Sequence, residues 1–134
     1  MENVIEFFIP LKEPPTITQQ EHKIAVIKGK PVFYDPPELK TVKNLFLGYL
    51  VPHRPEDPFH GPVRLTTKWI WPCRNKHEVG EYKATKPDTD NLLKAFKDCM
   101  TSSLYWKDDS QVASEITEKF YGDHPGIYVR VEEL

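Results

Sequence analysis

The sequence predicts a single compact α+β domain in which a mixed β-sheet packs against two main helices. The chain has 134 residues, which is the usual length of one domain. Hydrophobic residues make up 39 % and charged residues 28 %, so the chain can bury a core. Segments with the period of a strand interleave with segments of helical period, without internal repeats. We therefore treat residues 1–134 as one domain.

The first half of the chain is predicted to hold three strands and one helix. Residues 4–9 form an apolar run that ends at Pro10, which is typical of a buried strand. Two β-prone runs, 24–27 and 32–34, flank a short turn and predict a hairpin. Asp35, followed by two prolines and a glutamate, is a helix-start signal. The helix that follows has one apolar stripe, formed by Leu39, Val42, Leu45, Phe46 and Leu50.

The second half contains the clearest strand and a second helix. Between residues 63 and 71, one face of the predicted strand is apolar and the other is basic or polar. A helix is predicted from about residue 90 to residue 102. Its apolar stripe consists of Leu92, Leu93, Phe96, Cys99 and Met100. Two further strands, 111–121 and 126–131, are joined by a turn, and together these elements predict one sheet.

The composition argues against several classes of protein. No segment approaches the roughly 20 apolar residues that cross a bilayer, and the start of the chain has no signal-like leader. We therefore expect a cytoplasmic protein without a membrane partner. Two cysteines are too few for a disulfide framework. Cys73 and His77 alone are too few for a structural zinc site.

The distribution of charge changes what the net charge implies. The formal net charge of −2 argues against a nucleic-acid binder when it is taken over the whole chain. Residues 61–107 nevertheless carry nine basic and five acidic side chains, and residues 108–134 carry two and seven. Lysine and arginine contacts to phosphate dominate non-specific affinity for DNA, so DNA is expected to bind the middle segment. Trp69, Trp71, Tyr82 and Trp106 interleave with it, although the shared apolar face of Trp69 and Trp71 favours the core.

Two pairs of aspartates are the strongest chemical signal. Asp88 and Asp90 lie at the start of the second predicted helix, and Asp108 and Asp109 precede the next strand. Helix capping needs only one such residue, for about 1 kcal/mol, whereas neighbouring carboxylates repel unless a cation lies between them. Mg²⁺ prefers oxygen ligands, so a divalent cation is the alternative to capping. Asp109 could join the site if its strand lies beside the helix start, and Asp108 is the other member that could point inward.

Lys94 follows Asp90 by four residues, which places both side chains on one face of the helix. Beside a bound phosphate, its ammonium would stabilise the negative charge that develops during phosphodiester cleavage. The alternative is an ordinary salt bridge to Asp90 or Asp98. Asn91 would either support the site or simply begin the helix.

The run from Asp88 to Leu92, with Lys94, Asp98 and the segment 106–111, resembles the RusA family of Holliday junction resolvases. The motif-bearing part covers about residues 82–121. The resemblance implies a homodimer, often prophage-encoded, that nicks branched DNA symmetrically in recombination and repair. It implies Mg²⁺ as the cofactor, with Mn²⁺ as a substitute, and no small-molecule cofactor. The implied metal ligands are Asp88, Asp90 and Asp109, and the implied catalytic lysine is Lys94.

The lysines around this motif are the expected DNA contacts, namely Lys83, Lys86, Lys97 and Lys107. Founding members of the family have an arginine-rich run before the first aspartate, and here only two lysines stand there. A phosphatase of the haloacid dehalogenase type, an EF-hand loop and a sugar-nucleotide transferase fit the aspartate pattern less well. The alternative from another class is a non-catalytic DNA-binding module in which the acidic cluster is structural.

Overall fold

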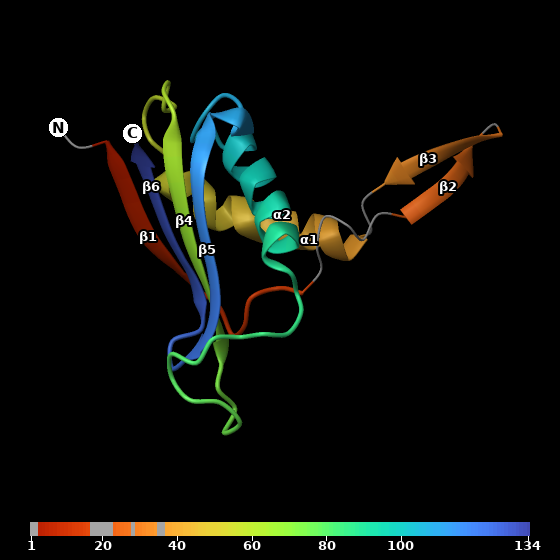
Figure 1. The fold of residues 1–134 in the computed structure, drawn as a ribbon. Coiled ribbons are helices and arrows are strands. Elements are labelled where there is room, and N and C mark those ends of the chain that lie inside the picture. The colour runs from red at the N-terminus through yellow and green to blue at the C-terminus, as the bar shows by residue number, and fades with distance from the viewer. Residues whose placement is uncertain (1–2, 17–22, 28, 35–36) are drawn as a thin grey trace.

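A computed structural model of the chain describes residues 3–16, 23–27, 29–34 and 37–134 (Figure 1). Its main sheet contains the strands β1 (Val4–Pro10), β4 (Val63–Pro72), β5 (Val112–Gly122) and β6 (Gly126–Glu133). Their order is β1-β6-β4-β5. Strand β6 is antiparallel to both of its neighbours, whereas β4 and β5 are parallel. The mixed sheet and the α+β class are therefore confirmed.

Two helices, α1 (Pro37–Leu50) and α2 (Thr89–Ser102), lie on the same side of this sheet (Figure 1). Trp69 of β4 reaches between them, with ring centroids 6.1 Å from Phe46 of α1 and 5.4 Å from Phe96 of α2. The side chains along β4 alternate between buried and half-buried, as the sequence predicted. Trp69, Trp71 and Trp106 are all buried, so the tryptophans of the basic segment belong to the core.

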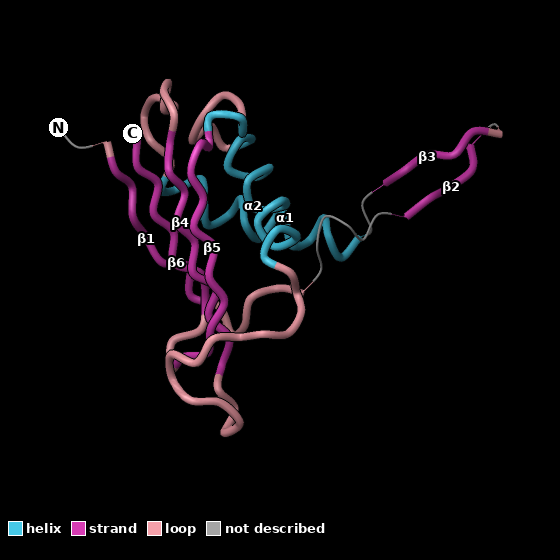
Figure 2. The backbone as a smooth tube through the Cα atoms, in the orientation of Figure 1, coloured by secondary structure: helices cyan, strands magenta, loops and turns pink. Residues whose placement is uncertain are grey.

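Two parts of the first half differ from the prediction. Strand β1 is an edge strand with Phe7 and Ile9 buried and Phe8 39 % exposed, so only one of its faces is covered. The predicted hairpin is present as β2 (Lys23–Ile27) and β3 (Lys30–Tyr34), but it forms its own two-stranded sheet. Figure 2 shows it projecting away from the main sheet. The expected cap at Asp35 lies outside the described residues.

The connections around α2 determine where the candidate residues lie. The chain leaves the end of β4, crosses the lower end of β5 in the loop 73–88, and then enters α2 (Figure 2). After α2, the short 3₁₀ helix Asp109–Gln111 leads into β5. Another 3₁₀ helix, Val51–His53, follows α1. Strand β5 therefore begins beside the end of α2 rather than beside its start (Figure 1).

Candidate active site

The start of α2 presents two carboxylates that do not serve as helix caps. Asp88 occupies the N-cap position in an extended conformation, yet its side chain makes no capping hydrogen bond. Its backbone carbonyl accepts from the Leu92 N–H at 3.1 Å, which is the ordinary first bond of the helix. Asp88 and Asp90 are both exposed at this positive end of the helix dipole. The capping interpretation does not account for either carboxylate.

A pocket of about 270 Å³ opens between α2 and the approach to β5. Asp90 and Lys94 line its helix side, as expected for residues four positions apart. Asp109 lines it from the 3₁₀ helix that precedes β5. The remaining lining residues are Leu93, Lys97, Asp98 and Glu115. Three of the four predicted catalytic residues, Asp90, Lys94 and Asp109, therefore share one pocket with Lys97, one of the expected DNA contacts.

Lys94 is not used in a salt bridge within the ranges that the structure describes. Asp98, one of the two salt-bridge partners that the sequence offered for Lys94, lies 4.0 Å from the Lys43 ammonium instead. The neighbouring Lys97 forms an ion pair with Glu115 across the pocket. The Lys94 charge thus faces the pocket while the other lysine of the helix face is neutralised.

The two members of the second acidic pair have different roles. Asp108 caps the short 3₁₀ helix, because its Oδ1 accepts from the Ser110 N–H at 2.9 Å. The Ser110 N–H lowers the pKa of the Asp108 carboxyl below its ordinary value. Gln111 completes the capping box by accepting from the Asp108 N–H at 3.3 Å. Asp109, the next residue, is exposed and lines the pocket. Alternation along a strand does not apply here, because the pair lies in a helical turn.

The three expected metal ligands do not converge on one point. Asp88 does not line the pocket that Asp90 and Asp109 share. In the described part of the chain, no group of three His, Cys, Asp or Glu side chains lies close enough to hold a metal ion. The physical reason is the direction of β5, whose first residues meet the far end of α2 (Figure 1). The sequence left open a start of this strand beside the first turn of the helix, and the structure places it beside the last turn instead.

Lys119 of β5 was not among the residues that the sequence singled out. Its Nζ donates to the carbonyl oxygens of Thr85 and Pro87, at 2.6 and 2.7 Å. Burial lowers the pKa of Lys119, the nearby Lys83 charge lowers it further, and the Asp88 charge opposes both. One feature of the sequence could have drawn attention to Lys119, because it is one of only two basic residues among residues 108–134.

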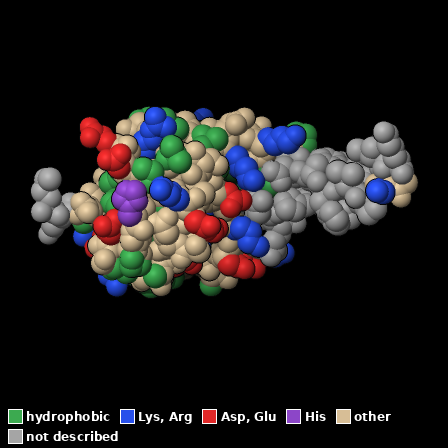
Figure 3. Space-filling model, turned by 90° about the horizontal axis from the view of Figure 1, so that it is seen from above, with side chains coloured by type: hydrophobic (Ala, Val, Ile, Leu, Met, Phe, Trp, Pro, Cys, Tyr) green, Lys and Arg blue, Asp and Glu red, His purple; other side chains and the backbone are tan. Residues whose placement is uncertain are grey.

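The four lysines expected to contact DNA have different surroundings. Lys83 lies over the rings of Trp71 and Tyr121, with its Nζ 5.1 and 5.4 Å from their centroids. Lys97 is paired with an acidic residue of the pocket, whereas Lys86 and Lys107 are exposed. In the view from above, basic and acidic side chains are interspersed and no face of one sign is visible (Figure 3).

His77 and Tyr82 also lie in the loop 73–88. His77 stacks on Tyr121 at 3.7 Å between centroids, and its Nδ1 lies 2.5 Å from a carboxylate oxygen of Glu81. Cys73 is a free thiol and half-buried. Tyr82, 70 % exposed, is the aromatic residue of the basic segment that remains open to solvent.

Comparisons with known proteins give a consistent result. A family model described as endodeoxyribonuclease RusA matches residues 13–132, which include every candidate residue named above. The chain is 31 % identical over 132 residues to the crossover junction endodeoxyribonuclease RusA of Lactococcus phage r1t, covering 96 % of this chain and 98 % of that protein. It is 32 % identical over 129 residues to the uncharacterized protein YqaN of Bacillus subtilis strain 168, covering 88 % and 90 %. None of the helices within the described residues is long and apolar enough to cross a membrane.

Proposed function

The chain belongs to the endodeoxyribonuclease RusA family, and from this premise we propose that it resolves four-way DNA junctions by symmetric phosphodiester cleavage in recombination and repair. The observation that carries the proposal is the shared pocket of Asp90, Lys94 and Asp109. A structural acidic cluster would have its carboxylates capping helices or paired with lysines. Asp90 and Lys94 instead have no ion pair in the ranges described, although they lie on one helix face.

A divalent cation fits the type of donor that the pocket supplies. Hard cations such as Mg²⁺ bind carboxylate oxygens, and Mg²⁺ commonly takes one or two protein carboxylates with water and substrate phosphate. Asp90 and Asp109 supply oxygens from the pocket, and Asp88 supplies oxygens from the N-cap position, two residues before Asp90. We propose that these three residues hold Mg²⁺, with Mn²⁺ as a substitute, and that binding of the ion would bring together side chains that do not converge on one point in the described structure. When bound, the ion would supply Lewis-acid polarisation of the scissile phosphate.

The chain's own residues would prepare the phosphate for attack. Lys94 brings a positive charge to the pocket on the same helix face as Asp90, where it would stabilise charge developing on the phosphate oxygens. Lys86 and Lys107, both exposed, would contact neighbouring phosphates. Lys83 would do so after leaving the aromatic rings that it lies over, and Lys97 after leaving its ion pair with Glu115.

Resolution of a junction requires two cuts, so we propose that the protein acts as a homodimer with one active site in each protomer. Its partner would be branched DNA in the cytoplasm, and a prophage origin fits the phage protein that it is similar to. No small-molecule cofactor is needed for this reaction. Sedimentation at working concentration should show a dimer, and a monomer that still cleaves both strands symmetrically would contradict this part.

The deciding experiment uses a labelled four-way junction, incubated with and without Mg²⁺, beside a linear duplex of the same sequence. We expect paired nicks in the junction only when Mg²⁺ is present, and chelation should abolish them. Binding without cleavage of any branched DNA at any divalent metal concentration would support the non-catalytic DNA-binding module instead.

A further inference from the structure

We propose that Lys119 is a positioning residue for this active site, because its ammonium ties the backbone immediately before Asp88 to strand β5. It would thereby hold the first turn of α2, which presents Asp88 and Asp90. The inference rests on the proposed function of these two aspartates.

The register of the sheet explains how a strand residue reaches this loop. Lys119 lies opposite Trp69 in the parallel ladder of β4 and β5. Trp69 is buried beneath the helices, so Lys119 projects from the same face of the sheet. Its Nζ donates to the carbonyl oxygens of Thr85 and Pro87 at 2.6 and 2.7 Å. Both are charge-assisted hydrogen bonds, and the second acceptor belongs to the residue directly before Asp88.

The rest of the loop is attached to β5 through backbone groups. The Gly80 N–H donates to the Tyr121 carbonyl at 2.8 Å, and the Tyr121 N–H donates to the backbone carbonyl of Glu81 at 2.9 Å. The Lys83 N–H donates to the carbonyl of Lys119 itself at 2.9 Å. Beyond Lys83 the attachment passes to the Lys119 side chain, which spans the last residues before the helix. Lys119 is therefore the tether nearest to the carboxylates.

A tether at this position has a direct effect on catalysis. Residues that orient metal ligands from outside the site typically change metal affinity or activity by about 10- to 100-fold when they are removed. Misplacement of a reacting group by about 1 Å is enough for a similar loss. If the Lys119 bonds are removed, the backbone that carries Asp88 gains freedom while the core beneath β4 stays packed.

The test compares Lys119→Met, Lys119→Arg and Lys68→Met in the full chain. Methionine removes the donors but keeps most of the side-chain length, and arginine retains donors. Lys68 is the matched control, because it lies on β4 and on the opposite face of the sheet from Lys119. Its partner Glu118, 4.0 Å away, contacts the loop at Tyr82, which is outside the segment 84–92. We expect Lys119→Met to lower kcat on a four-way junction by about 10- to 100-fold and to raise the Mg²⁺ concentration for half-maximal cleavage. KM for the junction should stay unchanged, Lys119→Arg should recover part of kcat, and Lys68→Met should match the wild type.

A readout that does not depend on cleavage separates this inference from the proposed function. Hydrogen–deuterium exchange of the segment 84–92 should be faster in Lys119→Met than in the wild type and unchanged in Lys68→Met. The inference is overturned if Lys119→Met has both the kcat and the exchange rate of the wild type. It is also overturned if Lys68→Met loses as much kcat as Lys119→Met, because the loss would then come from the removal of a positive charge alone. If the wild type cleaves no junction, the proposed function fails. The hydrogen–deuterium exchange of the segment 84–92 then decides by itself whether Lys119 holds this part of the backbone. Should Lys119→Met not fold, Lys119→Gln takes its place with the same expected outcomes.

Discussion

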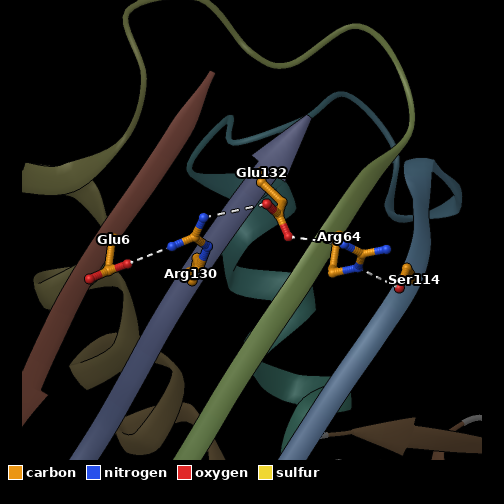
Figure 4. Close-up of polar contacts among 5 residues, drawn as sticks. All are labelled: Glu6, Arg64, Ser114, Arg130 and Glu132. Carbon is orange, nitrogen blue, oxygen red and sulfur yellow. Dashed lines mark hydrogen bonds and ion pairs between the residues drawn. The ribbon is translucent and has the colours of Figure 1, made fainter. Parts of the chain in front are cut away.

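The outer face of the sheet and the pocket beside α2 use their charged side chains in opposite ways. On the outer face, five residues from all four strands form a connected network (Figure 4). Arg130 contacts Glu6 at 3.0 Å and Glu132 at 3.5 Å. Arg64 contacts Glu132 at 3.2 Å and donates to the Ser114 hydroxyl at 3.0 Å. Each charge of this network therefore has a partner within the protein.

The pocket contains a similar mixture of charges, but they are only partly matched. Lys97 and Asp98 are paired with Glu115 and Lys43. Asp90 and Lys94 make no ion pair within the described ranges, even though they lie on one helix face. Charge density alone therefore does not mark a site in this protein. What distinguishes the pocket is charge that the fold leaves available for a ligand.

The largest expected effect is the loss of an unmatched carboxylate. Asp90→Asn should lower the rate of junction cleavage on the order of 10³-fold, because the neutral amide neither attracts a cation nor binds it well. Binding of the junction should be retained. Asp98→Asn is the matched control, since Asp98 lies on the same helix and lines the same pocket but is paired with Lys43. A wild-type rate for Asp90→Asn in gel-based cleavage assays would refute the site assignment.

Removal of the unmatched cation should have the next largest effect. Lys94→Met should reduce kcat by about 100-fold, because the charge that develops on the phosphate then lacks its protein counter-charge. Lys97→Met removes a lysine from the same helix face that is already neutralised by Glu115, so its kcat should change far less. Single-turnover cleavage at saturating Mg²⁺ measures both variants. An equal loss in both variants would contradict the distinction between matched and unmatched charges.

On the outer face, the same kind of substitution should affect stability rather than catalysis. Glu132→Gln removes the carboxylate that lies between Arg64 and Arg130. We expect the free energy of unfolding to fall by about 0.5–1 kcal/mol, with kcat unchanged, because ion pairs that solvent still reaches contribute little. Urea unfolding at low and high salt provides the measurement, and the difference should shrink at high salt. A large loss of cleavage would mean that this face takes part in function.

The smallest effect concerns the capping aspartate beside the pocket. The lowered pKa of Asp108 means that the folded state binds the proton less tightly than the unfolded state. The ionised carboxylate therefore stabilises the fold at pH values above its ordinary pKa of 3.8, and this stability is lost as the pH falls through the lowered value. Asparagine keeps a neutral acceptor for the Ser110 N–H, so Asp108→Asn should be slightly less stable at pH 7 and equal to the wild type in strong acid. Thermal unfolding from pH 7 down into strong acid, below the lowered pKa, tests this, and cleavage should stay near wild type.

Local patterns in the sequence predicted most of the individual elements. The strict alternation of residues 63–71 became β4, and the apolar stripe after Asp90 became the buried face of α2. Both patterns report which side of an element faces the core, and that is a local property. The same reasoning placed Trp69 and Trp71 in the core, where they are found. It treated β1 as fully buried, because an apolar run does not reveal that its strand will lie at the edge.

The candidate site was predicted in its residue types but not in its arrangement. The spacing of Asp90 and Lys94 implied a shared helix face, and both residues line the pocket. Asp108 and Asp109 have different roles because they lie at the start of a 3₁₀ helix, where the alternation of a strand does not apply. Lys119 was missed because its role depends on a loop that crosses β5, which only long-range contacts produce.

The sequence was therefore enough to predict the α+β class, most of the helices and strands, the family and the set of carboxylates and lysines available for chemistry. These depend on residue type and on spacing along one element. The tertiary structure alone decided that β5 begins beside the end of α2, that the hairpin stands apart, and which charges remain unmatched. The physical reason is that strand order and strand direction arise from pairing between distant segments, and the neutralisation of a charge depends on whichever side chain that pairing brings near.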